Sequence, residues 1–347
     1  MRRALAVALL LVVAAPACGG GDDDPRTVRL VTHDSFAASE DVFAAFTEQT
    51  GIEVEVIRAG DAGALVNQAV LSAGDPQGDV LYGIDTTFLT RGLDADLFAP
   101  YESPELANVA DALEIDAEHR VTPIDSADVC LNIDRGFFAA DGAPPTPTRL
   151  EDLTDPAYRD LLVVEDPATS SPGLAFLYAT VATFGDDGWQ AYWQGLRANG
   201  VAVADGWEDA YYGQFSGGGT SEGDRPIVVS YASSPPAEVV FADPPVDEPP
   251  TAVVEASCVR QVEYAGVLRG AAHEDEAHEL IDFLLSARFQ EDMPLQMFVF
   301  PVREGAALPD VFERFAVRPA EPIELDPFAI GATRDARIEE WTNLVLR

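Results

Sequence analysis

The chain has 347 residues, of which 47% are hydrophobic and 23% are charged, so it has the composition of a globular protein and not of a disordered acidic polymer. Acidic side chains outnumber basic ones by 60 to 21, a formal net charge of −39, which argues against a nucleic-acid partner because phosphate contacts require a basic face. All 21 basic residues are arginine. The absence of lysine excludes a Walker-A phosphate loop, a pyridoxal Schiff base and a lysine nucleophile.

The N-terminus has the pattern of a secretory signal. Basic residues precede the apolar run Ala4–Ala15, which is shorter than the roughly 20 residues that cross a bilayer. We expect residues 1–17 to be removed and the mature protein to lie outside the cytoplasmic membrane, at the cell surface or in the periplasm. Pro16–Gly19 resembles the lipobox of bacterial lipoproteins, so Cys18 is expected to carry lipid and residues 18–26 to form a flexible tether. Ordinary signal cleavage is the alternative.

From Thr27 onward, short β-rich runs alternate with helical stretches. The first strands are expected at Val28–Thr32, Glu53–Ile57 and Asp79–Gly83, and the helices between them at Ser39–Gln49 and Ala64–Ser72. This order predicts a parallel sheet with helices on its faces, in which ligands bind beyond the carboxyl ends of the strands. The residues expected there are Asp34, Ser35, Asp61, Ala62, Ile84 and Asp85.

A second α/β series follows Gly142–Pro147, a proline-rich segment that we interpret as a boundary loop. Its expected elements are Leu161–Val164, Ala175–Phe184, Gly188–Ala198, Val201–Ala204, Gly206–Phe215 and Ile227–Ser230. Val253–Arg269 is then expected to be extended, and Glu274–Leu285 to form an amphipathic helix. The pattern as a whole predicts two α/β lobes with a cleft between them.

Sequence motifs of several enzyme classes are absent. Neither H-E-x-x-H nor C-x-x-C occurs, and the glycine-rich segment Gly217–Gly223 is expected to be an exposed loop. His273 and His278 lie on different faces of the expected helix, so we expect no metal site there. From these observations we expect no catalytic residues and no resident metal or cofactor.

Two cysteines follow Cys18, namely Cys130 and Cys258. In an oxidising compartment an even number of cysteines favours a disulfide. Two buried thiols, or one cysteine acting as a nucleophile with a histidine, are the alternatives.

Two segments share a pattern of serines followed by proline, Thr169–Gly173 and Ala232–Pro236. Serine is a preferred N-cap and proline a preferred first-turn residue, so each segment predicts the start of a helix after a strand. The free backbone N–H groups and hydroxyls there suit polar or anionic ligand groups, although two well-capped helices are the simpler interpretation. Between these segments Trp207 follows an expected strand, where it would be either a core residue or a stacking wall.

Five segments occur in order along the chain: His33–Phe36, Gly83–Asp85, Asp166–Gly173, Gly206–Tyr211 and Ser230–Pro235. Together they resemble the thiamine-binding proteins of bacterial ABC importers, within the type II solute-binding proteins. The resemblance implies a two-lobed α/β fold of the type II periplasmic-binding-protein kind, with the ligand cleft between lobes joined by crossing hinge strands. It implies lobe limits of 27–125 and 259–347 for lobe I and 126–258 for lobe II.

The resemblance also implies a function and a set of ligand residues. The protein would be a monomeric, non-enzymatic receptor that binds thiamine or its phosphates and passes them to the permease subunits of an importer, with lipid as its only attachment to the membrane. The implied ligand residues are Asp61, Ala62, Ser170, Ser171, Trp207, Tyr231, Ala232, Ser233 and Ser234. Further candidates are Asp34, Ser35, Asp85, Tyr211 and Phe298. An aromatic wall suits the permanent cation of a thiazolium ring, with about 0.5–2 kcal/mol of cation–π attraction.

By the same resemblance, Cys130 and Cys258 fall on neighbouring hinge segments, which favours the disulfide. Two other functions stay open. One is the same receptor class with ferric ion or a polyamine as ligand, for which the adjacent Tyr211 and Tyr212 are a weak indication. The other is a thiamine-degrading transferase, which shares this fold and would require a free cysteine in the cleft.

The lipobox generates the first testable prediction. Replacement Cys18→Ser should release the mature protein into the medium or the soluble fraction, because the lipid would be lost. Fractionation followed by immunoblotting measures this, with the unaltered chain as control. Unchanged membrane association of the variant would contradict lipidation as the anchor.

Overall fold

The computed structural model describes residues 26–347, so the predicted signal sequence, Cys18 and the tether up to residue 25 lie outside the described residues. The strands are β1 Arg26–Thr32, β2 Ile52–Arg58, β3 Val80–Asp85, β4 Phe98–Ala99, β5 Thr122–Asp134, β6 Leu162–Glu165, β7 Ala202–Ala204, β8 Ile227–Tyr231, β9 Thr251–Leu268 and β10 Phe300–Pro301. The α-helices are α1 Glu40–Thr50, α2 Ala62–Leu71, α3 Leu89–Asp94, α4 Arg135–Ala139, α5 Ser171–Phe184, α6 Trp189–Ala198, α7 Pro235–Val240, α8 Glu274–Leu284, α9 Ala287–Gln290, α10 Met293–Gln296, α11 Asp310–Phe315 and α12 Pro327–Val345. Short 3₁₀ turns are η1 Pro104–Asn108, η2 Asp111–Leu113, η3 Leu150–Thr154 and η4 Pro156–Tyr158, and η5 Asp209–Gln214 is a π-helix.

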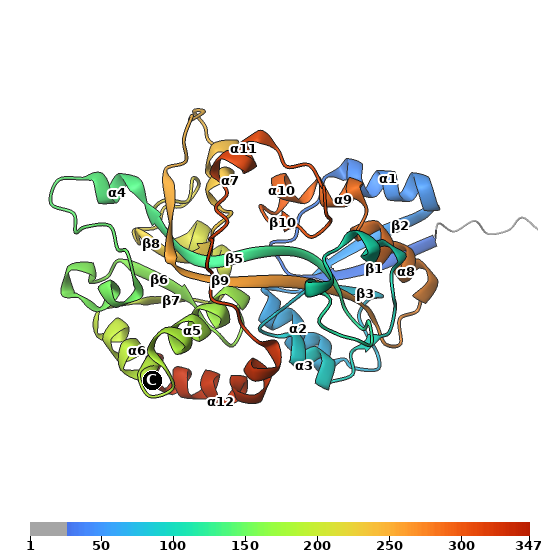
Figure 1. Ribbon diagram of the computed structural model, residues 1–347, viewed down its shortest axis with the longest axis horizontal. Coiled ribbons are helices and arrows are strands. Elements are labelled where there is room, and N and C mark those ends of the chain that lie inside the picture. The colour runs from blue at the N-terminus through green and yellow to red at the C-terminus, as the bar shows by residue number, and fades with distance from the viewer. Residues whose placement is uncertain (1–25) are drawn as a thin grey trace, which may run out of the picture.

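One mixed sheet runs through both lobes, with the strand order β2-β1-β3-β9-β5-β8-β6-β7. At one end β1 pairs in parallel with β2 and β3, and at the other end β6 pairs in parallel with β7 and β8. Between these parallel halves β9 runs antiparallel to both β3 and β5, and β5 runs antiparallel to β8. Figure 1 shows β5 and β9 side by side across the middle of the molecule. The two-lobed α/β fold expected from the sequence is confirmed.

Alternating apolar residues explain why helices cover both faces of the sheet in lobe I. Val28 and Leu30 of β1 pack in one core cluster with residues of α1 and α8. Val31, which points to the opposite face, packs in a second cluster with Leu65 of α2 and Leu89 of α3. A strand presents successive side chains to opposite faces of the sheet. A strand with apolar side chains on both faces must therefore be covered by helices on both faces.

The chain passes between the lobes at a different place from the expected boundary loop. Gly142–Pro147 follows α4 and lies within lobe II. The first crossing is β5, whose residues are buried except at its last position, and the second is β9. Proline and glycine marked a surface loop correctly here, but a continuous buried strand carries the chain from one lobe to the other.

Helix α12 contacts both lobes, although the sequence placed it in lobe I. Trp341 packs edge-on against Trp193 of α6, with ring centroids 5.3 Å apart. Nearer its start, Arg334 donates to the hydroxyl of Thr90 in α3. A Cβ at Gly331 would clash with the same threonine, so glycine permits this close approach. Among the described helices, none combines the length and apolarity needed to cross a membrane.

Cys130 of β5 and Cys258 of β9 form the expected disulfide. The pairing of the two strands is irregular at this point, because Val129 is opposite Val259 whereas Leu131 is opposite Val254. The extra residues of β9 form a bulge, and both cysteines are buried. The bond therefore holds the two crossing strands together where their regular hydrogen bonding is interrupted.

Removal of the disulfide should destabilise the fold. The double variant Cys130→Ser, Cys258→Ser is expected to lose about 2–5 kcal/mol of unfolding free energy, because the unfolded chain regains the freedom that the bond removes. Urea unfolding with and without reductant measures this, and peptide mapping without reduction should find Cys130 linked to Cys258. Two alkylatable thiols in the native, unreduced protein would contradict the bond.

Candidate functional site

A cavity that is partly open to solvent lies between the lobes. Its wall is formed by His33, Ser35, Ala37, Asp61, Ala62, Asp125, Ala127, Ser171, Trp207, Glu208, Tyr211, Tyr212, Tyr231, Ser234, Ala237, Phe241, Gln261, Glu263, Gln296, Met297, Phe298 and Val299. Several of these residues follow the carboxyl ends of parallel strands, where ligands bind in sheets of this kind. Acidic side chains supply the charge of this wall, and aromatic rings supply most of its apolar area.

An aromatic wall comes from lobe II. Trp207 is half-buried, and its ring is stacked on Tyr211 at 5.0 Å and meets Tyr212 edge-on at 5.4 Å. Its indole N–H donates to the hydroxyl of Ser230, 2.9 Å away, which fixes the ring plane. Tyr231 lies beside it, 6.2 Å between centroids. Trp207 thus lies on the cavity wall and also packs against a small core cluster of lobe II.

Phe298 of lobe I and Phe241 of lobe II meet across the cavity, with centroids 5.7 Å apart. Phe298 has a φ of 55°, in the left-handed region that side chains other than glycine rarely adopt. Strain of this kind persists only where the surrounding structure enforces it.

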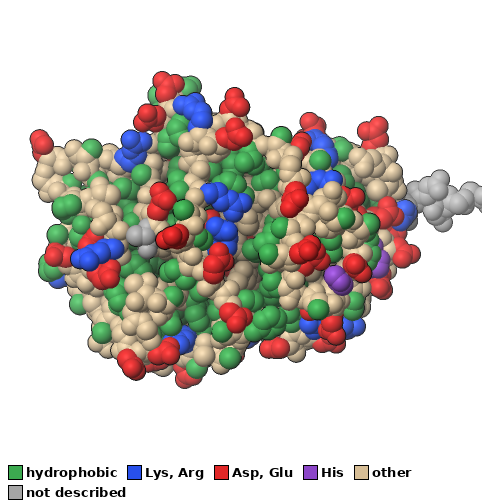
Figure 2. Space-filling view, in the orientation of Figure 1, with side chains coloured by type: hydrophobic (Ala, Val, Ile, Leu, Met, Phe, Trp, Pro, Cys, Tyr) green, Lys and Arg blue, Asp and Glu red, His purple; other side chains and the backbone are tan. Residues whose placement is uncertain are grey.

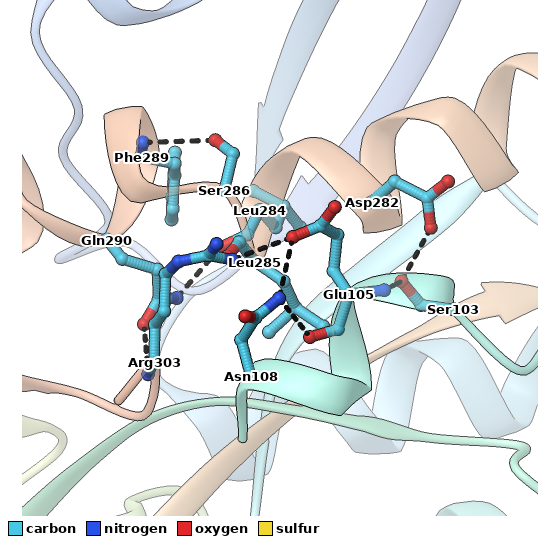
Figure 3. Close-up of polar contacts among 10 residues, drawn as sticks. All are labelled: Ser103, Glu105, Asn108, Asp282, Leu284, Leu285, Ser286, Phe289, Gln290 and Arg303. Carbon is cyan, nitrogen blue, oxygen red and sulfur yellow. Dashed lines mark hydrogen bonds and ion pairs between the residues drawn. The ribbon is translucent and has the colours of Figure 1, made fainter. Parts of the chain in front are cut away.

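A buried polar network fixes the chain just after Phe298. The amide of Gln290 donates to the carbonyls of Ile124 and Leu284 and accepts from the backbone N–H groups of Val302 and Arg303. Figure 3 shows its contacts with Leu284 and Arg303. The guanidinium of Arg303 in turn bonds to Glu105, 2.7 Å away. In addition, β10 pairs with Ser126 and Asp125 of β5. Together these contacts hold the segment that carries Phe298 against β5.

The carboxylate of Asp61 joins the two lobes. Asp61 precedes α2 in lobe I, and its Oδ2 accepts from the backbone N–H of Trp207 at 2.9 Å. Its Oδ1 accepts from the N–H of Ser171 at 3.4 Å, at the start of α5. Burial raises the pKa of Asp61, while hydrogen bonds from the N–H of Trp207, the hydroxyl of Ser170 and the N–H of Ala62 oppose the shift. The residue is thus a contact between protein segments as well as part of the wall.

A second acidic group consists of Asp125 and Glu263, which lie opposite each other on β5 and β9. The hydroxyl of Tyr82 donates to Asp125, and His33 places Nε2 3.6 Å from the Glu263 carboxylate. Burial and the neighbouring Glu263 raise the pKa of Asp125 well above its usual value. Burial by itself would lower the pKa of His33. The negative charges of Glu263, Asp61 and Asp34 outweigh burial, so the pKa of His33 is raised.

The structure brings most of the sequence-predicted ligand residues to the cavity. Those on its wall are Asp61, Ala62, Ser171, Trp207, Tyr231 and Ser234, and from the further candidates Ser35, Tyr211 and Phe298. Those away from the wall are Ser170, Ala232, Ser233, Asp34 and Asp85. Ser170 and Ser233 are fully buried, and Ala232 packs against the disulfide.

Asp85 has a structural contact that explains its position. Its carboxylate accepts from the N–H and hydroxyl of Thr87 and from the N–H of Phe88, at the turn between β3 and α3. Burial raises the pKa of Asp85 to about 6, against the opposing effect of the Thr87 bonds.

The two serine–proline segments do begin helices, as predicted, but not by side-chain capping. Ser170 and Ser234 occupy the N-cap positions of α5 and α7, and neither hydroxyl bonds to a backbone N–H there. At α5 the Asp61 carboxylate of the other lobe accepts one of the free N–H groups instead.

Sequence reasoning missed the acidic pair. Asp125 and Glu263 are far apart in the chain and lie within strands, not after them, so the rule about strand ends does not find them. Only their register, Asp125 opposite Glu263, brings them together. Gln261, two residues before Glu263, reaches the same wall by the alternation of β9.

Within residues 26–347 no cluster of three or more His, Cys, Asp and Glu side chains could hold a metal ion. The letters of Gly219–Gly223 match G-x-S-x-G, but the segment lacks the strand and helix of a nucleophile elbow, and the hydroxyl of Ser221 accepts from the N–H of Gly223. Both described cysteines are in the disulfide, so neither supplies the free thiol that the transferase alternative requires.

Two lobes that share crossing strands and enclose a polar and aromatic cavity define a type II solute-binding protein. Residues 75–318 match the family model of bacterial extracellular solute-binding proteins. The chain belongs to this family.

Individual relatives agree with this assignment. The chain is 29% identical to a thiamine-binding periplasmic protein of Salmonella typhimurium, over 91% of this chain and 92% of the relative. It is 28% identical to the thiamine-binding periplasmic protein of Escherichia coli, with the same coverage. A solved structure described as a periplasmic thiamin binding protein superposes with a TM-score of 0.79 at 26% identity, covering 92% of this chain and 96% of that one. The resemblance stated from the sequence is confirmed.

Asp85 makes the stability of the fold depend on pH. Its usual pKa is near 3.8 and its folded value is about 6, so the folded state binds more protons between these values. The unfolding free energy should therefore fall as pH rises through this window, by up to about 3 kcal/mol from this group. Asp85→Asn, which cannot ionise, should reduce the difference in melting temperature between pH 5 and pH 7.5. Asp247→Asn, at an exposed position, is the matched control, and an unchanged pH profile in Asp85→Asn would contradict the assignment.

Proposed function

We propose that this chain is the receptor of an ABC importer for thiamine, which it binds in the cavity between the lobes and delivers unchanged to the permease subunits. The observation that carries the proposal is the composition of the cavity wall, where several aromatic rings face buried carboxylates and no arginine is present. Such a wall favours an aromatic cation. The names of the relatives supply the particular ligand.

Each part of thiamine has a matching part of the wall. The thiazolium ring is a permanent cation, which the faces of Trp207 and Tyr231 and the charge of Glu263 would attract. The aminopyrimidine can donate to and accept from neutral polar groups, such as Gln261 and the hydroxyl of Ser234. We propose as ligand residues the predicted ones on the wall, namely Asp61, Ala62, Ser171, Trp207, Tyr231 and Ser234.

The proposal includes a place and a mode of action. The receptor would work as a monomer outside the cytoplasmic membrane, attached by lipid on Cys18, and would need no resident metal or cofactor. Acidic side chains are scattered over the face drawn in Figure 2 and are not gathered in one patch. Their field would attract a cation generally, but salt screens it beyond about 8 Å, so affinity must come from the cavity.

Calorimetry with purified protein tests the function directly. Thiamine should bind with one site per chain, and thiochrome, the neutral oxidised form of thiamine, should bind much more weakly because it lacks the cation. Ferric citrate and spermidine are the competing ligands. Binding of either in preference to thiamine, or no binding of thiamine, would overturn the proposal.

Trp207→Ala tests the aromatic wall. Buried aromatic anchors dominate many binding sites, so the variant should lose at least about 2 kcal/mol, some thirtyfold in Kd. Trp207→Phe keeps a ring face and should lose much less. The other three tryptophans are 1% exposed or less, so quenching of fluorescence by thiamine should be lost in both variants. Unchanged affinity in folded Trp207→Ala would contradict the stacking role.

A further inference from the structure

His33 is the one basic side chain on the cavity wall among the described residues. It follows directly after β1, at the edge where ligands bind in sheets of this kind. A Cβ at Gly83 of β3 would clash with the imidazole, so glycine at that position lets the ring lie against the strand. Histidine is the side chain whose ordinary pKa lies closest to neutrality, so His33 can change its charge within the physiological pH range.

The imidazole faces a carboxylate of the hinge. Its Nε2 is 3.6 Å from Glu263, and each of the two side chains is 13% exposed. Nε2 is buried and has no hydrogen-bond partner among the described residues, so the attraction to Glu263 is one of charge and weakens when His33 loses its proton. Beside this pair, the ring of Tyr82 lies 5.9 Å from that of His33, and its hydroxyl donates to Asp125.

Acidic groups also approach His33 from its own lobe. Asp34 is the next residue in the chain, and Asp61 precedes α2. Burial by itself would lower the pKa of the imidazole, but the charges of Glu263 and of these two residues outweigh burial and raise it. The surroundings of His33 thus favour its protonated form.

The charge of His33 also acts across the cavity on lobe II. Burial raises the pKa of Glu208, and the positive charges of His33 and Arg58 oppose this shift. Asp34 and Asp61 act in the same direction as burial. Arg58, at the end of β2, stays charged because a guanidinium does not lose its proton in proteins. Of these two positive charges, only that of His33 can be removed by a change of pH.

The thiazolium ring of thiamine would use the same carboxylate. It is a permanent cation, and a position near Glu263 stabilises it most when no other cation is paired with that residue. A protonated His33 offsets the charge of Glu263 and repels a second cation, and this repulsion is stronger in a partly desolvated cavity than in water. A neutral His33 does neither.

We propose that a proton on His33 and the thiazolium ring of thiamine compete for the Glu263 carboxylate, so that acidification weakens binding of the ligand. The inference rests on the proposed function and adds control by pH to it. The bound cation disfavours the charged imidazole, so the pKa of His33 is lower in the complex than in the free protein. Between these two pKa values binding expels a proton, and the affinity for thiamine therefore rises with pH.

Calorimetry at pH 6, 7 and 8, in buffers of different ionisation enthalpy, tests the competition. Thiamine should bind at least about fivefold more tightly at pH 8 than at pH 6, within the limit of about tenfold per pH unit that one proton sets. The dependence of the heat on the buffer should show release of up to about one proton per chain. Equal affinity across this range with no release of protons would overturn the inference and leave the proposed function intact. Failure to bind thiamine at any pH would instead overturn the proposed function.

The substitution His33→Asn assigns the effect to one side chain, because asparagine cannot ionise. The variant should bind thiamine with nearly equal affinity at pH 6 and pH 8 and should release no proton. His119→Asn is the matched control, because His119 also lies within 4.0 Å of two carboxylates, those of Glu102 and Glu114, but is not on the cavity wall. This control should keep the pH dependence of the wild type. A folded His33→Asn variant that keeps this dependence, or that binds thiamine at no pH, would overturn the inference.

Proton NMR of the unaltered protein tests the same inference without a substitution. The imidazole resonance of His33 should titrate at a lower pH with saturating thiamine than without it. The resonances of the other three histidines, His119, His273 and His278, should titrate as before. An unchanged titration of His33 would overturn the inference even if His33→Asn does not fold.

Discussion

The antiparallel pairing of β5 with β9 is the constraint on which the rest of the structure depends. Both strands run through the two lobes, so each lobe completes its own parallel sheet against the same central pair. The register of this pair sets Asp125 opposite Glu263 at the centre of the cavity and brings Cys130 close to Cys258 further along. A shift of one residue would turn every side chain of a strand to the other face and remove both arrangements.

Burial gives the site its electrical character. Burial and the neighbouring Glu263 raise the pKa of Asp125 on the hinge, whereas the oxygens of Asp61 accept from backbone N–H groups of the other lobe. The contact between the lobes and the cavity wall therefore share a residue, Asp61. The aromatic rings add apolar area without adding charge, and Ser230 fixes the plane of Trp207.

Local patterns in the sequence were enough to predict the elements and the general place of the site. Hydrophobic alternation placed β1, β2 and β3, and the strand-end rule found Asp61, because it depends only on short-range order. The same rule failed for Asp85, whose side chain closes its own turn. It could not find Asp125 and Glu263, since register between distant strands is a property of the folded sheet. Gly142–Pro147 showed that breaker residues identify loops and not lobe boundaries.

The disulfide determines which part of the chain can extend when the molecule unfolds under mechanical force. It joins two positions 128 residues apart, and the chain between them contains β6, β7 and β8 with the helices that cover them. The disulfide closes this inserted segment into a covalent ring. In the chain-entropy model, the conformational entropy that the unfolded chain loses through this closure corresponds to about 5 kcal/mol. The described segments on either side of the ring, from Arg26 onward and up to Arg347, contain no disulfide of their own. Under mechanical pulling at the two ends of the chain, lobe I would extend first, and the ring would transmit force through its sulfur–sulfur bond while its interior stayed unloaded.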